Sequence, residues 1–253
     1  MNPSEGIVPL FSFVHPSPKG LGSIRDGEGY MILNRMLVDA ETVADVLERL
    51  GDIPANRVRW HPSPGTATER DLIAIVNGPN KRLCELVDGT LVEKAVGQYE
   101  SRLAYLIGHF LENYLEQHDL GIGYGADAML RIVAGRVRLP DVSFVSWDKL
   151  PNRELPAEAI ADLAPDLAVE VLSESNTRRE MENKRREYFQ GGAKLVWEID
   201  PDTQSARVYT SPDAFEEIGP DGALDGRDVL PGFILPLRQL FDRAGRRRGK
   251  GSN

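Results

Sequence analysis

The sequence predicts a mixed α/β domain, in which a sheet is flanked by helices, and three observations indicate this fold class. Residues 98–118 carry apolar side chains at helical spacing, which is typical of an amphipathic helix. Strand-like runs follow at residues 128–133, 138–146 and 167–172. A second helical segment at residues 177–190 precedes further strand-like runs. The order helix, strand, strand, strand, helix, strand favours a sheet with helices packed on it.

The N-terminal part gives weaker signals. Residues 1–35 are rich in Gly, Pro and Ser and show no period, which predicts a loosely ordered arm. Residues 39–50 fit a short helix that Gly51 ends. Residues 71–76 fit either a short strand or the start of a helix. We therefore expect residues 1–78 to form an arm and a small helical extension.

The main domain is expected over residues 79–240. It should begin with a hairpin, because strand-like residues flank the turn pair Asp88-Gly89. The long helix should end at the glycine-rich stretch Gly121–Gly125. That stretch resembles a dinucleotide-binding loop, but it follows a helix rather than a strand, so a helix stop and turn is the better interpretation.

The second half of this domain should be rich in strands. The runs at 128–133 and 138–146 should be joined across Ala134-Gly135. Residues 194–199 and 206–210 fit two more strands, and the last third should be terminal β structure. A basic tail without regular structure is expected over residues 241–253.

Composition narrows the class of protein. The net charge of −9 argues against a general polyanion binder, although a local basic cleft is compatible with it. The lone Cys84 excludes an intrachain disulfide and a Cys-based zinc site, and it suits the reducing cytoplasm where we place the protein. No apolar run approaches the length of about 20 residues that a membrane helix needs, so no membrane association is expected.

Two carboxylates stand where acids are unusual. Glu170 interrupts the apolar run Leu167–Leu172, and burying a carboxylate is costly unless it is paired or binds a metal. A structural ion pair or an edge strand is the alternative. Asp141 follows Pro140 at the start of a strand, where an ordinary loop acid is also common.

Two further side chains share a face with apolar neighbours. Glu100 lies on the apolar face of the long helix, where it could alternatively interact with the helix dipole. Lys184 lies between Met181 and Tyr188 on the second helix and could simply extend its ammonium group to solvent. Together these residues suit a site for Mg²⁺, or Mn²⁺ in its place, in which a lysine assists an attacking water.

At this point the residues resemble a known family. Several groups of residues over 82–210 resemble, in their order and spacing, the Uma-two family of putative restriction endonucleases, which belongs to the PD-(D/E)XK nuclease superfamily. These groups are Cys84–Gly89, Pro140-Asp141, Asp166–Ser173, Glu180, Lys184, Tyr188, Gly191 and Trp197–Pro201. The resemblance implies a restriction-endonuclease-like PD-(D/E)XK core.

The resemblance also assigns roles. Asp141 matches the Asp of the PD motif, and Glu170 matches the acid of the following strand, so both would bind the metal. The superfamily has a Lys two residues after that acid, where this chain has Leu172. The family's Lys stands instead in the following helix, at Lys184. Glu100 matches a polar position of the first helix and would be an auxiliary ligand or base.

Three hypotheses follow. The first is a Mg²⁺-dependent endonuclease that hydrolyses phosphodiester bonds in DNA, with Asp141, Glu170, Lys184 and Glu100 as its catalytic residues. The second is an inactive nuclease-fold module that binds nucleic acid or a protein partner, which the acidic charge and Leu172 motivate. The third is a structural homodimer through the β-rich C-terminal part. Basic residues of the second helix could contact phosphates, although a solvated helix face is the simpler interpretation: Arg178, Arg179, Arg185 and Arg186.

Overall fold

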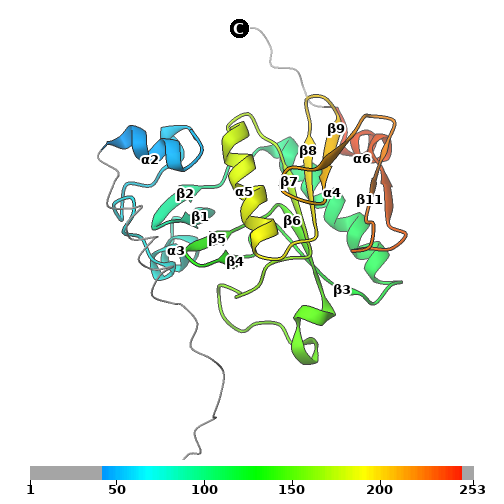
Figure 1. Ribbon diagram of the computed structural model, residues 1–253, viewed down its shortest axis with the longest axis horizontal. Helices are drawn as coiled ribbons and strands as arrows, with labels where there is room; N and C mark the ends of the chain where they lie inside the picture. Colours follow the sequence, from blue (N-terminus) through cyan, green and yellow to red (C-terminus); the bar gives the residue numbers. More distant parts are fainter. Residues whose placement is uncertain (1–41, 247–253) are drawn as a thin grey trace, which may run out of the picture.

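The computed structural model describes residues 42–246, which form a six-stranded sheet, a four-stranded sheet and a two-stranded hairpin with helices around them (Figure 1). The expected N-terminal arm, residues 1–35, lies outside the described residues, as do residues 247–253 of the tail. Within the described part of the chain, no helix combines the length and the apolar character that crossing a membrane requires.

The larger sheet forms the centre of the molecule, with strand order β10-β9-β8-β7-β6-β3. Its strands are β3 (Gly121–Tyr124), β6 (Val142–Ser146), β7 (Leu167–Val171), β8 (Leu195–Asp200), β9 (Ser205–Tyr209) and β10 (Phe215–Ile218). Only the pair β7–β8 is parallel, and helix α5 (Arg178–Gln190) makes the crossover between these two strands. The other pairs are antiparallel. This sheet and its helices confirm the predicted mixed α/β fold class.

Helices cover both faces of this sheet. Helix α4 (Gln98–Leu115) packs on one face, where Leu167, Val169 and Val171 of β7 point into the main core. Helix α5 packs on the other face, where Tyr188 contacts Ala168 and Val196. In Figure 1, α5 lies in front of β7 and β8, and α4 lies behind them. Because side chains alternate along a strand, Glu170 points to the α5 side, as Ala168 does.

The four-stranded sheet, of order β2-β1-β5-β4, lies beside the first. Its strands are β1 (Cys84–Val87), β2 (Thr90–Glu93), β4 (Leu130–Val133) and β5 (Arg136–Arg138). The predicted hairpin is confirmed, since β1 pairs with β2 around Asp88 and Gly89. Both turn residues have positive φ, 46° and 71°, as a type I′ turn requires.

The N-terminal helices pack onto this second sheet. Helix α2 (Val43–Arg49) confirms the predicted short helix, and α3 (Glu69–Val76) resolves the ambiguous segment as helical. Helix α3 buries Leu72 and Val76 in a core with residues of β1, and the segment after α2 buries Ile53 against the hairpin. Gly51 has a φ of 91°, and its missing side chain lets the backbone of α5 approach closely.

Two sequence predictions for strands were wrong. The run 138–146 is not one strand: β5 pairs with β4 across the Ala134-Gly135 turn, whereas β6 belongs to the other sheet. Pro140 lies at the break, where it has no N–H to donate. The stretch predicted as a helix stop and turn is instead strand β3, which pairs with β6 along its length. Pairing with a neighbouring strand outweighs the glycine content here.

The C-terminal part contains β11 (Ala223–Asp225) and β12 (Ile234–Pro236), which form the small hairpin, and then helix α6 (Leu237–Ala244). The predicted terminal β structure is therefore only partly correct. Helix α6 extends past residue 240, and Leu237, Leu240 and Phe241 are buried in the main core. Part of the segment expected to be a tail thus packs on α4.

Candidate active site

A row of three carboxylates crosses adjacent strands of the larger sheet. Val142 of β6 pairs with Val169 of β7, so the next position along places Asp141 opposite Glu170. Glu170 in turn pairs with Glu198 of β8. Opposite residues on paired strands lie about 5 Å apart, so the sheet alone brings the two sequence-predicted acids, Asp141 and Glu170, together.

Helix α5 supplies side chains that contact two acids of this row, Glu170 and Glu198. The Nζ atom of Lys184 lies 3.3 Å from Oε1 of Glu170, and the hydroxyl group of Tyr188 donates to the same oxygen at 2.6 Å. Lys184 and Tyr188 are one turn apart, which places both over β7. Arg185 makes a 2.6 Å contact with Oε1 of Glu198. Consecutive basic residues of one helix thus each hold one acid of the sheet.

Glu85 of β1 is a site residue that was not singled out from the sequence. It is fully buried, and its Oε1 atom lies 3.0 Å from Nζ of Lys184. Arg138 contacts its other oxygen at 2.8 Å, and the backbone N–H of Leu139 donates to Oε1. The sequence pattern that could have identified Glu85 is the one that identified Glu170. Each is an acid inside a run of apolar residues, and Glu85 lies between Cys84 and Leu86.

The electrostatics divide these buried acids into two kinds. Burial, together with the negative charges of Asp141 and Glu85, raises the pKa of Glu170 to about 7, although Lys184 opposes the shift. Burial alone would also raise the pKa of Glu85, but the positive charges of Lys184 and Arg138 outweigh it and lower that pKa to about 2. Glu170 is therefore the acid of this pair that holds a proton most readily.

Asp141 lies at the boundary between this buried network and solvent, with its side chain 16% exposed. Its Oδ2 atom accepts the backbone N–H of Val171 at 2.7 Å. Its Oδ1 atom lies 2.8 Å from Nζ of Lys94, which also donates to the carbonyl of Ala126 at 3.2 Å. Lys94 is a second residue missed from the sequence. It follows β2 in the chain, and only the fold shows that this strand end reaches Asp141.

Glu100 reaches the same area from the first turn of α4. Glu100 is buried, and its carboxylate lies against the helix cap Gly97, where an added Cβ atom would force the carboxylate to move. Glu100, Asp141 and Lys94 all line one pocket of about 630 Å³. Glu100 and Asp141 therefore line the same cavity, whereas Glu170 and Lys184 are buried and do not line it.

The donor chemistry fits a divalent cation held by few protein ligands. Asp141 and Glu170 offer oxygen atoms, which Mg²⁺ prefers, and the negative charges of Asp141 and Glu85 add to burial in raising the pKa of Glu170. The ammonium groups of Lys94 and Lys184 already lie against these two acids, so a metal ion would compete with them for the carboxylate oxygens. Among residues 42–246, no three His, Cys, Asp or Glu side chains form a ready ligand set. An ion would thus be bound through two carboxylates and complete its shell with water, as Mg²⁺ commonly does.

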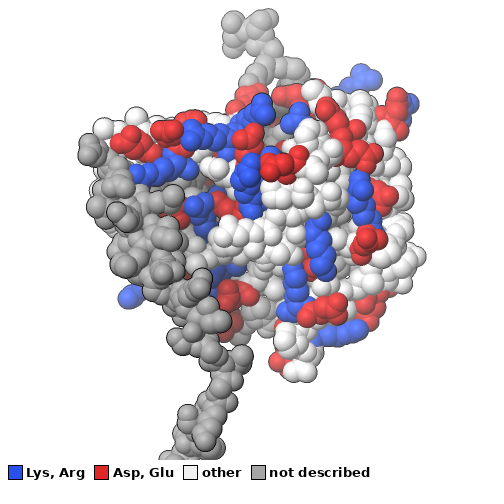
Figure 2. Space-filling view, viewed as in Figure 1, with Lys and Arg blue, Asp and Glu red and all other residues white. Residues whose placement is uncertain are grey.

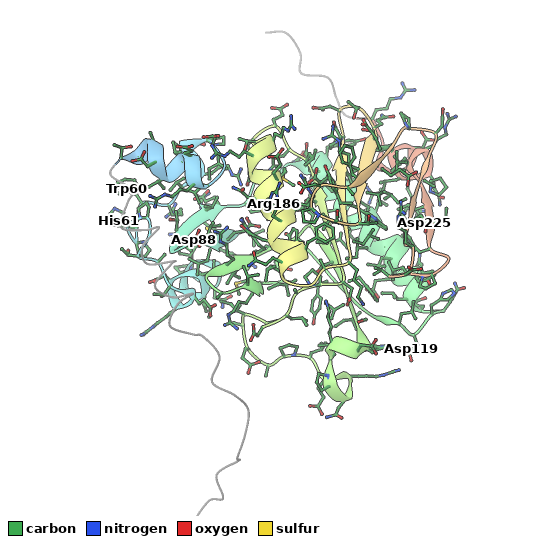
Figure 3. All side chains as sticks on the ribbon, in the orientation of Figure 1. Trp60, His61, Asp88, Asp119, Arg186 and Asp225 are labelled. Carbon is green, nitrogen blue, oxygen red and sulfur yellow. The ribbon has the colours of Figure 1, made fainter. Side chains whose placement is uncertain are left out.

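Most basic residues of α5 are already engaged. Arg178, Arg179 and Arg186 form exposed ion pairs with Glu182, Glu48 and Asp213, and Arg185 is buried. The face that carries α5 shows Lys and Arg interspersed with Asp and Glu rather than a continuous basic patch (Figure 2). Arg186 lies on α5 and Asp88 lies in the β1–β2 turn (Figure 3), and Arg136 contacts both Asp88 and Glu187, the neighbour of Arg186. These contacts favour the solvated-face interpretation of the exposed arginines.

This fold and this site define a restriction-endonuclease-like α/β protein. The model of the Uma2 family, described as "Putative restriction endonuclease", matches residues 72–238, so the chain belongs to that family. The match starts inside α3, and therefore includes part of the N-terminal extension. No curated protein shows a significant match to the chain.

A solved structure supports the same fold. It is described as a putative nuclease belonging to DUF820 from Anabaena variabilis ATCC 29413, and it is similar to this chain with a TM-score of 0.57 at 20% sequence identity. The similarity covers 64% of this chain and 90% of that one. At this identity, the comparison establishes the architecture alone.

Proposed function

We propose that this protein is a metal-dependent endonuclease that hydrolyses phosphodiester bonds in DNA. The observation that carries the proposal is the position of Asp141 opposite Glu170 on paired strands, with the ammonium group of Lys184 on Glu170. DNA as the substrate is supported by the family description, which names restriction endonucleases.

The acids of the site differ in exposure, and we assign their roles accordingly. Asp141 is partly exposed, so it can reach an ion, and a phosphate would be held at Asp141 only through that ion, whereas Glu170 is buried and would contact the ion from the sheet side. A bound Mg²⁺ would lower the pKa of a coordinated water and neutralise charge on the phosphate. Lys184 holds Glu170 and Glu85 in place, and Glu100 adds a further carboxylate to the lining of the pocket that Asp141 also lines.

Two observations favour a second candidate function. Leu172 occupies the position where the superfamily has its lysine, and both oxygens of Asp141 already have partners, Lys94 and Val171. A chain with these features could bind nucleic acid or a protein without cutting. In that case it would bind Mg²⁺ and Mn²⁺ poorly.

Cleavage assays separate the two candidates. The purified protein is incubated with supercoiled, linear and single-stranded DNA in Mg²⁺ or Mn²⁺, beside the Asp141→Ala and Glu170→Ala variants. The endonuclease proposal expects metal-dependent cleavage that is lost in both variants. Absence of cleavage together with absence of metal binding by calorimetry would reject it in favour of the inactive module.

A further inference from the structure

The pocket beside Asp141 is larger than an ion and a water need. It measures about 630 Å³ and is lined by residues of α4 and β3, by the segment after β2 that contains Lys94, and by Asp141. Its walls are mainly apolar or glycine, and they include Val96, Ala104 and Leu111. A pocket of this size and character is typical of a small-molecule or single-group binding site rather than of a metal site alone.

Glycines create this space, and at two positions packing does not demand them. Gly108 lies in the middle of α4, where glycine weakens a helix relative to alanine. Apart from its chain neighbours and the backbone of its own helix, a Cβ atom added at Gly108 or at Gly125 would meet no described atom within 4 Å. Glycine at position 108 therefore lowers the stability of α4 and leaves a space that a larger side chain at this position could fill. A ligand in the pocket would account for this.

The lining suits a flat, uncharged group. Tyr105, His109 and Tyr124 offer rings, and Tyr105 is 68% exposed at the rim. Ser101 and Glu112 offer hydrogen-bond acceptors along the same wall. Among the described lining residues, Lys94 is the only Lys or Arg, and it already contacts Asp141 and the carbonyl of Ala126. A phosphate would find no free cation inside this pocket.

We propose that this cavity is a base pocket, which receives an unpaired nucleobase of the substrate strand whose phosphate lies at Asp141. This inference rests on the proposed nuclease function and specifies its substrate class. A base inside a duplex is stacked and paired and must first be extruded, whereas a base of a single strand is free to enter and stack on aromatic rings. The substrate is therefore single-stranded DNA, or DNA with a locally unpaired segment.

Matched variants test this inference. Gly108→Leu fills the base pocket with a good helix former and should leave the fold intact, which circular dichroism checks. Tyr105→Ala removes a ring from the rim, and Tyr105→Phe retains it. Gly219→Leu is the control, because Gly219 is exposed, lies outside the pocket lining, and an added Cβ meets no described atom within 4 Å there as well.

Cleavage is measured on a single strand and on the fully paired duplex of the same sequence, with Mg²⁺. The wild type should cut the single strand faster. Gly108→Leu should lower kcat/KM on it at least roughly 10-fold, from the loss of one stacked base. Tyr105→Ala should act in the same direction, Tyr105→Phe, which keeps the ring, should lower kcat/KM less than Tyr105→Ala does, and Gly219→Leu should resemble the wild type. Equal cleavage of duplex and single strand, unchanged by Gly108→Leu, would overturn the base pocket while leaving the nuclease function in place.

Binding in EDTA tests the base pocket independently of catalysis. A fluorescent single-stranded oligonucleotide is compared with the same strand carrying abasic positions. The wild type should bind the intact strand more tightly, and Gly108→Leu should abolish that difference. If this holds while no DNA is cut in Mg²⁺ or Mn²⁺, the nuclease proposal fails and the base pocket stands. If the wild type binds both strands equally, the base pocket is rejected whatever the cleavage result.

Discussion

The ammonium group of Lys184 in helix α5 lies 3.3 Å from Oε1 of Glu170 in strand β7. Both side chains are buried. Glu85 lies on the other side of the same ammonium group, at 3.0 Å. A buried charge is costly unless an opposite charge lies within reach. The lysine therefore stabilises two acids at once, and the fold and the site depend on the same contact.

We expect Lys184→Met to lower the free energy of unfolding by about 3 kcal/mol at pH 7, because it leaves Glu85 and Glu170 without their shared partner. The matched control is Lys194→Met, since Lys194 is 64% exposed and its ion pair with Asp166 should contribute less than about 1 kcal/mol. Urea denaturation of the wild type and both variants measures these differences. Equal losses in the two variants would contradict a structural role for the buried lysine.

The stability of the protein should change with pH through Glu170. Its pKa is raised from 4.5 to about 7, chiefly by burial, so the folded state holds the proton more tightly than the unfolded state does. The stability that this provides is complete below pH 4.5 and is lost as the pH rises through 7. Glu170→Gln removes the titration, and the variant should gain about 1–3 kcal/mol relative to the wild type between pH 5 and pH 8.

Urea denaturation at several pH values between 5 and 8 checks this, with the exposed Glu116→Gln as the control. Glu85 does not interfere, because its pKa is lowered to about 2 by Lys184 and Arg138 against the opposing effect of burial. The stability that it contributes is present above pH 4.5 and is lost only at lower pH. A constant difference between wild type and Glu170→Gln across this range would mean that Glu170 does not titrate there.

The acids of the site could be predicted from the sequence only in part, and the residues show why. Glu170 was found because an acid interrupts a five-residue buried strand, a signal that local sequence carries. Glu85 carries the same signal, but β1 has only four residues and reads first as one arm of a hairpin. Lys94 could not be found, because its contact with Asp141 depends on how two sheets lie against each other.

The fold shows the same division. Amphipathic helices and buried apolar strands, such as α4 and β7, follow from periodicity. Strand β3 does not, because its sequence Gly-Ile-Gly-Tyr favours a turn and only pairing with β6 makes it a strand. Helix α6 was missed although Leu237, Leu240 and Phe241 have helical spacing, since eight residues give a short pattern beside a basic tail.

Lys94 should compete with a metal ion for Asp141. Its Nζ atom lies 2.8 Å from Oδ1, the oxygen of Asp141 that faces away from the backbone N–H of Val171. Lys94→Met removes this competitor, so Mn²⁺ should bind about 10-fold more tightly, a gain of about 1.4 kcal/mol. Isothermal titration calorimetry measures the affinity, and Asp141→Asn in the Lys94→Met background should abolish the gain. An unchanged affinity in Lys94→Met would show that the ion does not use this oxygen.

The N-terminal extension should be coupled to the site through Arg57 and Glu180. The guanidinium group of Arg57, in the short 3₁₀ helix Ala55–Arg57, contacts both carboxylate oxygens of Glu180 at 2.7 and 2.9 Å, and both residues are buried. Glu180 lies in the first turn of α5, one turn before Lys184. Removing one member of such a buried bidentate pair leaves the other uncompensated, so Arg57→Met and Glu180→Gln should each lower the free energy of unfolding by about 3 kcal/mol.

The double variant distinguishes a specific pair from two independent losses. Because the second substitution removes the charge that the first leaves unpaired, Arg57→Met with Glu180→Gln should cost less than the sum of the single changes by about 1–3 kcal/mol. Arg59 and Glu93 provide the control cycle, since their 2.9 Å pair is more exposed and should show coupling below about 1 kcal/mol. Additive effects of Arg57 and Glu180 would mean that the extension contributes to stability without acting on α5. Coupling would mean that loosening the extension also loosens the helix that carries Lys184.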